Sequence, residues 1–579
     1  MARTWKQLVA AVAGLASAVT LAAGSPALAH PPGSHTPNGH APSGHAPNSH
    51  APASHRSAGH PTKPTRAATM TEQRCEALAD LRVPARRIGL PTSGAEIESA
   101  TWSSSGGTGG GATYCQVVGW IRPVHEGSPS MQFEVNLPAV WNLRTLQMGG
   151  GGYDGSLVTG LDPYTAQPAG EETPLQQGYV TLGSDGGHQG GPGFDGTFGL
   201  DDEALLNYGK ASVKKTHDAA AVVIRDAYRR IPAYSYFIGG SQGGHEALDA
   251  AARYPKDYDG VIANYPAYNV TMMHEGAVNF RDALYGDGGV GWLSPAKTKT
   301  ITDAVYAACD GLDGATDQII SDVRGCDRAF DPDTLRCPSG TDEGDSCLSD
   351  AQLASAKKIA TDYDLGFPIA GNRIFARSAL FEGALYQGFS GFGASPQPSN
   401  PISGTEALQY IVLDQTSKYI VTRDPSLDTM TFDPAQWKRR IQQVGRIMDV
   451  TDVSLKPFLR RGGKIILTHG TADDFITPHN TIQYYDRQVR QLGARTLDSF
   501  LRFYEIPGFG HGQGPFDATY DGLEAIRGWV EKGHAPAGLV TYDGNAGADR
   551  SRPLCRYPTW PRYVGHGSLD DASSYTCTR

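Results

Sequence analysis

From about residue 117 to 270 the chain alternates short apolar runs, glycine turns and helical segments, and this alternation constrains the fold most. The apolar runs are expected to be strands, and a helix is expected near 209–230. Strands that alternate with helices are typical of a mostly parallel sheet covered by helices on both faces. The strand pattern resumes at 462–473 and ends at 500–511. We therefore predict an α/β fold.

The interval between these two blocks, 272–445, carries two pairs of cysteines, aspartate-rich loops and many aromatic residues. It interrupts the alternation of strands and helices instead of continuing it. We predict that it is a lid domain inserted over the sheet, and that the catalytic domain consists of 67–271 and 446–579.

The first 66 residues are expected to lie outside the catalytic fold. Residues 1–29 combine a basic start, an apolar core and Ala-Leu-Ala before His30, which is typical of a signal peptide; a membrane anchor is the alternative. In 30–66 histidine recurs every five residues among proline, glycine and serine, a period of neither helix nor strand. This tail is interpreted as a soluble spacer or a weak ligand of transition metals. We predict a secreted protein.

Net charge and cysteine number limit the partners and the compartment. A net charge of −10 argues against nucleic acid, which requires a basic face, and no later segment is apolar enough to predict a membrane span. The eight cysteines of an exported chain indicate four disulfides, whereas zinc is disfavoured because the chain has no Cys-x-x-Cys. On the order of a hundred pairings are open. The simplest joins sequence neighbours: Cys75–Cys115, Cys309–Cys326, Cys337–Cys347 and Cys555–Cys577.

The sequence Gly-Gly-Ser-Gln-Gly at 239–243 follows an apolar strand and precedes an alanine-rich helical stretch. A nucleophilic serine at the end of a strand needs such a strained turn, with small neighbours that clash with neither strand nor helix. The same string is expected by chance in a chain with 71 glycines, so a structural turn is the competing interpretation. The strand–turn–helix context favours a nucleophile at Ser241.

A serine nucleophile needs a base, and the base needs an orienting acid. Asp473 lies directly after one buried strand, and His511 follows the next. This is the order serine, acid, histidine of the α/β-hydrolase fold, with each group at the carboxyl end of a strand. Singly they are ordinary turn and surface-loop residues, and Asp474 is the rival acid. Together they predict a Ser241–His511–Asp473 triad on an α/β-hydrolase fold.

The oxyanion of an acyl transfer needs two backbone N–H donors. Gln242, directly after the serine, is expected to supply one of them. The glycine run in 148–155 is expected to supply the other from Gly150 or Gly151, because glycine lets the backbone approach a substrate closely. A phosphate-binding loop is excluded there, since no Gly-Lys-Ser/Thr follows.

A second glycine-rich loop, 183–190, follows another strand of the predicted sheet. Its glycines would again let the backbone come close to a bound substrate. His188 is therefore predicted to bind substrate, with Asp185 as a further candidate. Both residues are equally well interpreted as ordinary parts of a turn.

The best metal candidate is 309–326, an acidic loop between two cysteines. Calcium takes about six to eight oxygen ligands, which aspartates and backbone carbonyls provide. The expected ligands are the side chains of Asp310, Asp313 and Asp317 and the carbonyls of Ala315 and Ile319. The spacing is not that of an EF-hand, and from spacing alone calcium and a solvated acidic loop stay equally open.

In combination these motifs resemble the tannase and feruloyl esterase family of secreted α/β-hydrolases. The resemblance runs from Cys75 to Cys577 and rests on GGGGYDG, GSDGGHQG, GGSQGGHEAL, CDGLDGATDQIISD, HGTAD and PGFGH. It implies the triad, an inserted lid, calcium held in the lid by the ligands named above, and neighbour pairing of the cysteines. It also implies substrates that are esters of aromatic acids: gallates, ferulates and other hydroxycinnamates, and a terephthalate monoester in one branch.

The chain departs from the family pattern at two positions. Members usually carry a cysteine before the serine and another after the histidine, joined beneath the triad, but Gly240 and Gly512 stand there in this chain. Both are replaced together, as expected if the pair is lost as a unit. The departure raises the question of what holds the His511 loop against the turn that carries Ser241.

We predict a secreted serine carboxylesterase that hydrolyses esters of hydroxycinnamic acids, a feruloyl esterase. The alternatives are a tannase acting on galloyl esters, a broad aryl esterase and, outside enzymes, a non-catalytic binding protein on the same fold. The expected partner is a small aromatic ester or an ester linked to a plant polymer. Its ring is expected to lie against aromatic residues of 379–393; the alternative interpretation is that these aromatic residues belong to the core. No organic cofactor is expected, and the oligomeric state is not predicted.

Overall fold

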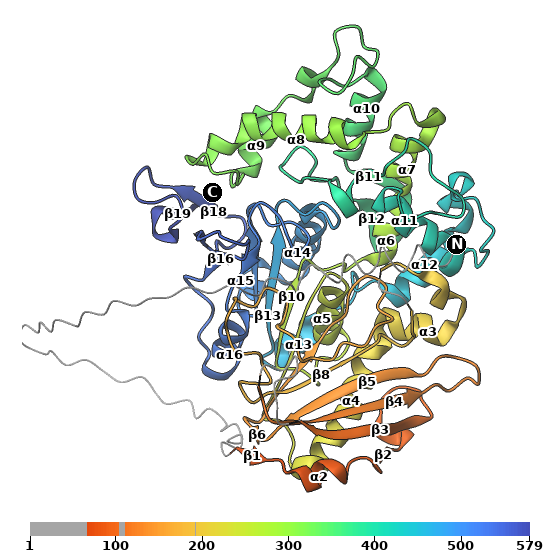
Figure 1. Cartoon of the computed structure of the whole chain (residues 1–579), viewed down its shortest axis with the longest axis vertical. Helices are drawn as coiled ribbons and strands as arrows, with labels where there is room; N and C mark the ends of the chain where they lie inside the picture. Colours follow the sequence, from red (N-terminus) through yellow and green to blue (C-terminus); the bar gives the residue numbers. More distant parts are fainter. Residues whose placement is uncertain (1–66, 104–110, 191–192) are drawn as a thin grey trace, which may run out of the picture. The chain divides into compact units, whose positions relative to one another are not determined.

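The computed structural model of the chain is organised around a ten-stranded sheet (Figure 1). Five of its nine neighbouring pairs are parallel and four are antiparallel. The spatial order is β14-β13-β10-β9-β7-β8-β5-β4-β3-β2. The bounds are β2 (Arg82–Val83), β3 (Gly94–Ser103), β4 (Tyr114–Arg122), β5 (Met131–Pro138), β7 (Arg144–Met148), β8 (Val180–Ser184), β9 (Tyr234–Gly240), β10 (Gly260–Asn264), β13 (Lys464–Gly470) and β14 (Leu501–Ile506).

The structure describes residues 67–579 except 104–110 and 191–192. The predicted signal peptide and histidine-rich tail, 1–29 and 30–66, therefore lie outside the described residues. From residue 67 onward the chain belongs to a single unit. The boundaries of the catalytic and lid domains within this unit stay a prediction.

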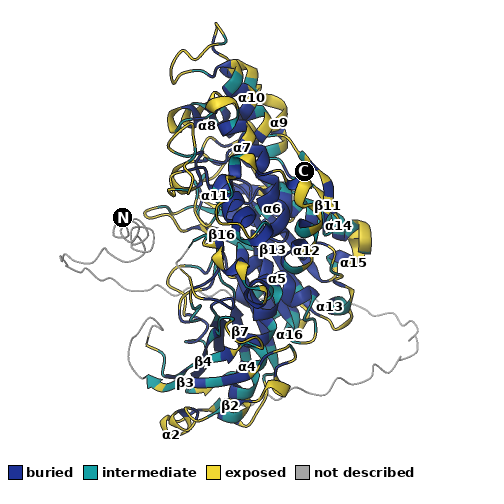
Figure 2. Cartoon of the chain, turned by 90° about the vertical axis from the view of Figure 1, so that its right-hand side faces the viewer, coloured by how far each residue is buried: buried dark blue, intermediate teal, exposed yellow. Residues whose placement is uncertain are grey.

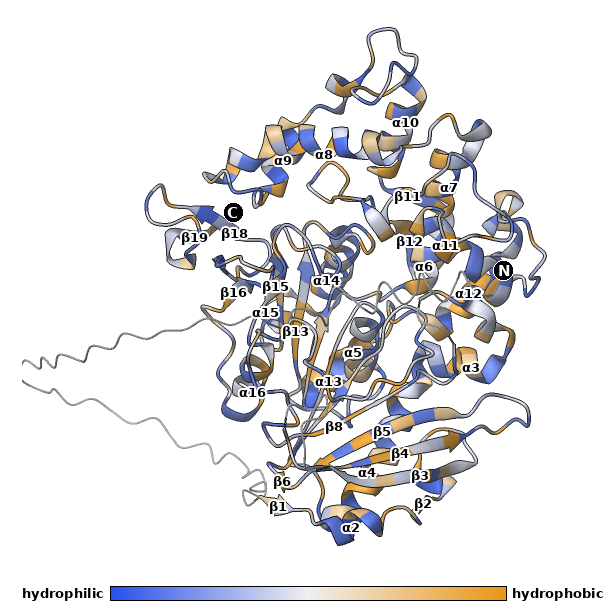
Figure 3. Ribbon diagram, in the orientation of Figure 1, coloured by the Kyte–Doolittle hydropathy of each residue, from blue (hydrophilic) through white to orange (hydrophobic). Residues whose placement is uncertain are grey.

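The parallel half of the sheet has helices on both faces, as the alternating pattern predicted. Along β9, β10 and β13, alternate residues point to opposite sides, so that Phe237, Val261 and Ile465 join one core and Ile238, Ile262 and Ile466 join another. Helix α5 (Gln242–Ala252) packs on the first face and α16 (Gly522–Lys532) on the second. Because both faces are buried, these strands are continuous apolar runs. Figure 3 shows the hydrophobic colours along the central strands.

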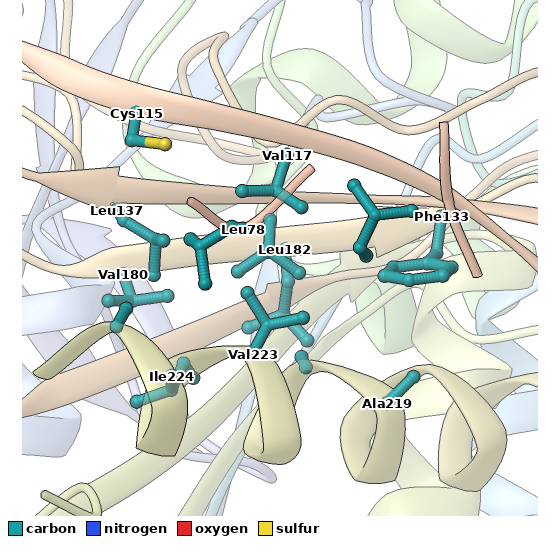
Figure 4. Packing of buried hydrophobic residues seen from close by; sticks show 14 of the residues in the cluster. Leu78, Cys115, Val117, Phe133, Leu137, Val180, Leu182, Ala219, Val223 and Ile224 are labelled. Carbon is teal, nitrogen blue, oxygen red and sulfur yellow. The ribbon is translucent and has the colours of Figure 1, made fainter. Parts of the chain in front are cut away.

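The other half of the sheet is an antiparallel wing that the sequence pattern did not predict. β3, β4 and β5 follow one another along the chain and pair in that order, each strand antiparallel to the next. Helix α4 (Ser212–Tyr228) covers this wing, and Figure 4 shows Val223 and Ile224 of the helix packed against Leu137, Val180 and Leu182 of the strands. The prediction of a mostly parallel sheet therefore holds only for the part that carries the loops described below.

No strand of the central sheet comes from the segment between β10 and β13, which is mostly helical (green to cyan in Figure 1). It has a core of its own, and Figure 2 shows deep burial on α6 and α11. Its main elements are α6 (Val270–Gly276), α7 (Val278–Tyr285), α8 (Pro295–Cys309), α9 (Val323–Ala329), α10 (Asp350–Ile359), β11 (Tyr363–Ile369), β12 (Asn372–Phe375), α11 (Leu408–Gln415) and α12 (Lys438–Met448). The predicted insertion, 272–445, falls within this segment, and its assignment as a lid domain stays a prediction.

Smaller elements complete the described chain. They are β1 (Ala68–Thr69), α2 (Glu72–Glu76), β6 (Val140–Trp141), α3 (Asp202–Leu206), α13 (Lys456–Arg460), α14 (Pro478–Leu492), α15 (Ala494–Asp498), β15 (Ala518–Thr519), β16 (Val540–Asp543), β17 (Ser551–Pro553), β18 (Trp560–Tyr563) and β19 (Tyr575–Thr578). In the part of the chain that the structure describes, no helix has the length and apolar character needed to cross a membrane.

Four disulfides use all eight cysteines, and each joins sequence neighbours. Cys75–Cys115 ties α2 to strand β4 of the antiparallel wing, and Cys555–Cys577 closes the C-terminal segment. The other two, Cys309–Cys326 and Cys337–Cys347, lie in the inserted segment. This is the pairing that neighbour order and the resemblance indicated.

Candidate active site

Ser241 is the only residue between strand β9 and helix α5. Its backbone is in the left-handed region, with φ of 59°, which a residue with a side chain rarely adopts. Glycine is needed beside it, because a Cβ on Gly239 would lie 2.4 Å from the carbonyl carbon of Gly243. The local sequence thus produces a tight turn that holds a serine at the carboxyl end of a strand, the geometry of a nucleophile elbow.

The three residues predicted as a triad come together at this edge of the sheet. His511 Nε2 lies 3.0 Å from Ser241 Oγ, and His511 Nδ1 lies 3.0 Å from Asp473 Oδ2. Asp473 follows β13 and is fully buried, whereas the His511 side chain, after β14, is 21% exposed. A buried carboxylate, an imidazole and a serine in this order are able to remove the serine proton and stabilise the resulting imidazolium.

The electrostatics of the site keep Asp473 ionised. Burial alone would raise the pKa of this carboxyl group, but the charges and hydrogen bonds of His511 and His469 bring it well below its usual range. The amides of Phe475 and Ile476 also donate to Asp473 Oδ1, at 2.9 and 2.8 Å. For His511, burial lowers the pKa, yet the Asp473 carboxylate raises it more, so the net pKa is above the ordinary value.

Asp474, the rival acid, points elsewhere. Its carboxylate accepts a hydrogen bond from Ser390 Oγ in the inserted segment, and its carbonyl accepts one from Gln409 Nε2 at 3.3 Å. Burial raises the pKa of Asp474 to about 6. Asp474 therefore connects the inserted segment to the loop after β13, while Asp473 alone contacts the imidazole.

The glycine run after β7 faces the elbow, but Gly150 is not available as an oxyanion donor. Its N–H donates to Glu246 Oε2 on helix α5, at 2.9 Å. Its carbonyl accepts from the amide of Gly243 at 3.0 Å, which ties the run to the elbow. No described atom lies within 4 Å of the place where a Cβ would sit on Gly151, so this residue faces open space.

Gln242 begins helix α5, so its amide has no partner within the helix. Its side chain is used differently: Oε1 accepts from the hydroxyl of Tyr208 at 3.2 Å. Gln242 and Gly151 are thus the residues whose amides the geometry leaves for an oxyanion.

The loop 183–190 is built from internal contacts. Asp185 accepts from the amides of Gln132 and Gly187, both at 2.9 Å, so it holds the turn together. The His188 ring stacks on Phe198 with 4.2 Å between ring centroids, and burial lowers its pKa to about 4. His188 is therefore neutral at physiological pH, and its predicted contact with substrate stays a prediction.

Aromatic rings form a chain that leads from the triad to the surface. Phe475 packs edge-on against His511 at 5.3 Å, and Phe194 packs edge-on against Phe475 at 5.5 Å between centroids. Phe389 stacks on Phe194 at 6.4 Å and is 65% exposed. Within 379–393, Phe389 is thus the exposed ring, while Tyr386 and Phe392 are core residues.

The acidic loop 309–326 holds its carboxylates by its own amides. Asp310 Oδ1 accepts from the amides of Asp317 and Gln318, at 3.2 and 2.9 Å, and Asp313 from those of Ala315 and Ser321, at 3.0 and 3.1 Å. The Asp317 carboxylate pairs with Arg552. Three carboxylates that bind one calcium ion must converge on it.

That convergence is not present in the described residues. Their only trio of histidine, cysteine or carboxylate ligand atoms within 4.8 Å of one another belongs to His217, Asp218 and Asp257. There the ammonium of Lys214 already lies 2.7 Å from Asp218 and 3.0 Å from Asp257. The aspartates at 310, 313 and 317 would need to turn towards one another to fit a calcium ion.

Several residues of the site have no signal in the sequence pattern. Phe194 and Tyr265 reach the triad region only through the folding of distant segments, and nothing in their local sequence marks them. Glu246 lies only five residues after Ser241, but nothing in the sequence indicates that its carboxylate accepts from Gly150. Phe475 and His469 flank Asp473 within four residues, so proximity to the predicted acid was a usable signal for these two.

The chain is similar to known esterases. A family model described as "Tannase and feruloyl esterase" matches residues 115–578. An uncharacterized esterase of Agrobacterium fabrum is 38% identical over 515 residues, which cover 87% of this chain and 92% of the relative. A mono(2-hydroxyethyl) terephthalate hydrolase of Piscinibacter sakaiensis is 29% identical over 570 residues, with 87% and 91% covered. The crystal structure of feruloyl esterase B from Aspergillus oryzae superposes with a TM-score of 0.71 at 22% identity, covering 88% of this chain and 100% of that one, and shares the α/β-hydrolase fold.

Proposed function

Because the chain belongs to the tannase and feruloyl esterase family, and is therefore a carboxylic ester hydrolase, we propose that it cleaves esters of aromatic acids, feruloyl esters first. The observation that carries the proposal is the continuous hydrogen-bonded line Ser241–His511–Asp473, with 3.0 Å at each step. No organic cofactor enters the proposed reaction, since these side chains and two backbone amides supply every group it uses.

In the proposed acylation step, Ser241 Oγ attacks the ester carbonyl carbon while its proton passes to His511 Nε2. Asp473, kept ionised by its hydrogen bonds, stabilises the imidazolium. The amides of Gln242 and Gly151 donate to the oxyanion of the tetrahedral intermediate. The intermediate collapses, the alcohol leaves with the proton from His511, and the acyl group stays on Ser241. Water, activated by His511 in the same way, then releases the acid and restores the serine.

An aromatic acyl group suits the rings beside the triad. Phe475 contacts His511, and Phe194 and Phe389 continue from it to the surface. Aromatic rings pack favourably edge to face or offset, so a planar acyl group gains contacts here that an aliphatic chain does not. We propose that the ring of the acid lies against Phe194 and Phe389, with His188 as a further contact.

Galloyl esters and a terephthalate monoester are the alternative substrates, favoured respectively by the family description and by the Piscinibacter relative. The test is a hydrolysis panel of methyl ferulate, methyl gallate, mono(2-hydroxyethyl) terephthalate and methyl butyrate. The proposal expects the highest kcat/KM for methyl ferulate and the lowest for methyl butyrate. A preference for methyl gallate would favour tannase activity, and a preference for the butyrate would contradict an aromatic acyl site.

Calcium at the acidic loop is proposed as a structural ion on the strength of the resemblance. Burial, together with the charge of Asp317, raises the pKa of Asp313 to about 6, so a cation would relieve a real repulsion. The side chains of Asp310, Asp313 and Asp317 and the carbonyls of Ala315 and Ile319 would hold it. Calcium should then raise the Tm of chelator-treated protein but not that of Asp313→Asn; an equal response of both would refute the assignment.

We propose that the chain is a family member without a cysteine pair beside the triad, exported by the predicted signal peptide. All eight cysteines are used in four bridges elsewhere, and Gly240 and Gly512 flank the serine and the histidine. Mild reductant should therefore lower activity only in step with unfolding. Rapid inactivation at unchanged Tm would contradict this.

A further inference from the structure

Tyr265 follows strand β10 directly and has an unusual backbone. Its φ is 32°, in the left-handed region, although it carries a bulky side chain. Such a conformation costs free energy and persists only where the surroundings fix it. Here the Tyr265 amide donates to the carbonyl of Thr468 at 2.7 Å, and the side chain is 7% exposed. The surroundings of Tyr265 therefore fix its backbone conformation and, with it, the position of the ring.

The ring fills the space between the loops that carry the nucleophile and the base. A Cβ on Gly240, the residue before Ser241, would lie 2.7 Å from both Cζ and the hydroxyl oxygen of Tyr265. A Cβ on Gly512, the residue after His511, would lie 3.5 Å from the same hydroxyl oxygen. The absence of a side chain at Gly240 therefore leaves room for the Tyr265 ring, whose hydroxyl also lies at van der Waals distance from Gly512.

The same ring contacts the imidazole itself. Tyr265 and His511 pack edge to face, with 4.9 Å between ring centroids and 62° between planes. Tyr265 also packs edge-on against Phe509, two residues before the histidine, at 5.7 Å. The loop of His511 thus rests on the Tyr265 ring at two points.

The two hydrogen bonds of His511 do not restrict every motion of its imidazole ring. They fix the distances of Nδ1 from Asp473 and of Nε2 from Ser241, but a tilt of the imidazole about the axis through its two nitrogens, accompanied by movement of the loop that carries it, changes neither distance. Ring contacts from Tyr265 and from Phe475, at 5.3 Å, restrict this rotation and the drift of the loop.

We propose that Tyr265 is a positioning residue: its aromatic ring, held by a strained backbone in the space beside Gly240, keeps the imidazole of His511 in line with Ser241. This inference rests on the proposed triad. The positioning role belongs to the aromatic ring of Tyr265 and not to its hydroxyl group, because the contacts with His511 and Phe509 are ring contacts.

The test compares three variants of the full chain. Tyr265→Leu removes the ring, Tyr265→Phe keeps it, and Tyr179→Leu is the matched control, since Tyr179 is a fully buried ring of the same core cluster whose ring partner, Tyr236, is also outside the site. Misplacing a catalytic group by about 1 Å costs up to roughly 100-fold in rate. We expect kcat of Tyr265→Leu to fall about 10- to 100-fold at nearly unchanged KM. Tyr265→Phe should stay close to wild type, and Tyr179→Leu should lose Tm but not kcat.

A second readout is independent of the substrate chosen. The rate at which a fluorophosphonate labels Ser241 also depends on His511, so it should fall in Tyr265→Leu by a factor similar to that of kcat. Should Leu prevent folding, Tyr265→Met fills the same space with a flexible side chain and carries the same expectation.

The outcomes separate the two claims. If Tyr265→Leu behaves like Tyr179→Leu while Ser241→Ala is inactive, the positioning role is overturned and the triad stands. If Tyr265→Phe loses as much as Tyr265→Leu, the ring is not what positions the base. If wild type is neither labelled nor active on any ester, the proposed function itself fails.

Discussion

Gly150 donates its backbone N–H to the Glu246 carboxylate at 2.9 Å, which ties the glycine run after β7 to the helix that follows the nucleophile. Glu246 lies five residues beyond Ser241 on helix α5, so this helix connects Ser241 to the glycine run, the two sides of the proposed oxyanion site. The position of the remaining free amide, that of Gly151, depends on this connection.

Glu246→Ala is expected to loosen the glycine run and lower kcat. Complete loss of one oxyanion donor costs about 100- to 1,000-fold, so a displaced donor should cost on the order of 10-fold. Glu246→Gln is the matched variant, because its side-chain carbonyl still accepts from Gly150. Steady-state kinetics should show a kcat close to wild type for Glu246→Gln and a lower kcat for Glu246→Ala. Equal kcat of Glu246→Ala and wild type would show that Glu246 does not support the proposed oxyanion site.

Asparagine substitutions at the neighbouring aspartates, Asp473 and Asp474, should lower kcat to very different extents. Asp473→Asn is expected to lower kcat by roughly 10⁴-fold, because the amide favours the wrong imidazole tautomer. Asp474→Asn keeps the geometry of the triad and should change kcat by less than about 5-fold, since Asp474 bonds Ser390 and not His511. The reverse ranking in kcat would identify Asp474 as the acid.

Removal of the Phe389 ring should raise KM only for esters with an aromatic acyl group. Phe389→Ala removes an exposed ring that stacks on Phe194, so KM for methyl ferulate is expected to rise about 3- to 10-fold, the value of one aromatic contact. KM for methyl butyrate should not change. Tyr542→Ala, at another ring that is 53% exposed, is the control. Equal changes for both esters would place the acyl ring elsewhere.

Stability should fall as the pH rises from about 5 to about 8, partly through Glu275. Both carboxylate oxygens of this buried residue lack a hydrogen-bond partner within the described chain, and burial raises its pKa to about 8. A carboxyl group with a raised pKa in the folded state stays protonated there after the unfolded chain has ionised. Its contribution is therefore full only below the ordinary carboxyl pKa of about 4, and is lost progressively until the pH reaches about 8.

For Glu275 this loss is on the order of 1 kcal/mol for each pH unit between about pH 5 and pH 8. Denaturant titrations should show Glu275→Gln to be less sensitive to pH over this window than wild type. The other buried carboxyl groups with raised pKa, such as Asp449 and Glu505, both near 7, remain in both proteins and keep part of the slope. Identical slopes would show that Glu275 is ionised in the folded protein.

The sequence was sufficient to predict those residues of the candidate site whose positions follow from chain order and from the ends of strands. Ser241, Asp473 and His511 each follow a recognisable apolar strand, and parallel strands bring their carboxyl ends to one edge. Gly150 was assigned wrongly as a donor because the direction of its N–H depends on Glu246, almost a hundred residues away in the chain. Tyr265 was not predicted, since the direction of an aromatic side chain depends on tertiary packing.

The central claim is that Ser241 is the nucleophile of an ester hydrolase. Its most direct test is mass spectrometry of the intact protein after treatment with a fluorophosphonate, for wild type and Ser241→Ala. We predict one phosphonyl adduct on the wild type, located on the peptide that contains Ser241, and none on the variant. An unlabelled wild type, or an adduct that survives Ser241→Ala, would contradict the account.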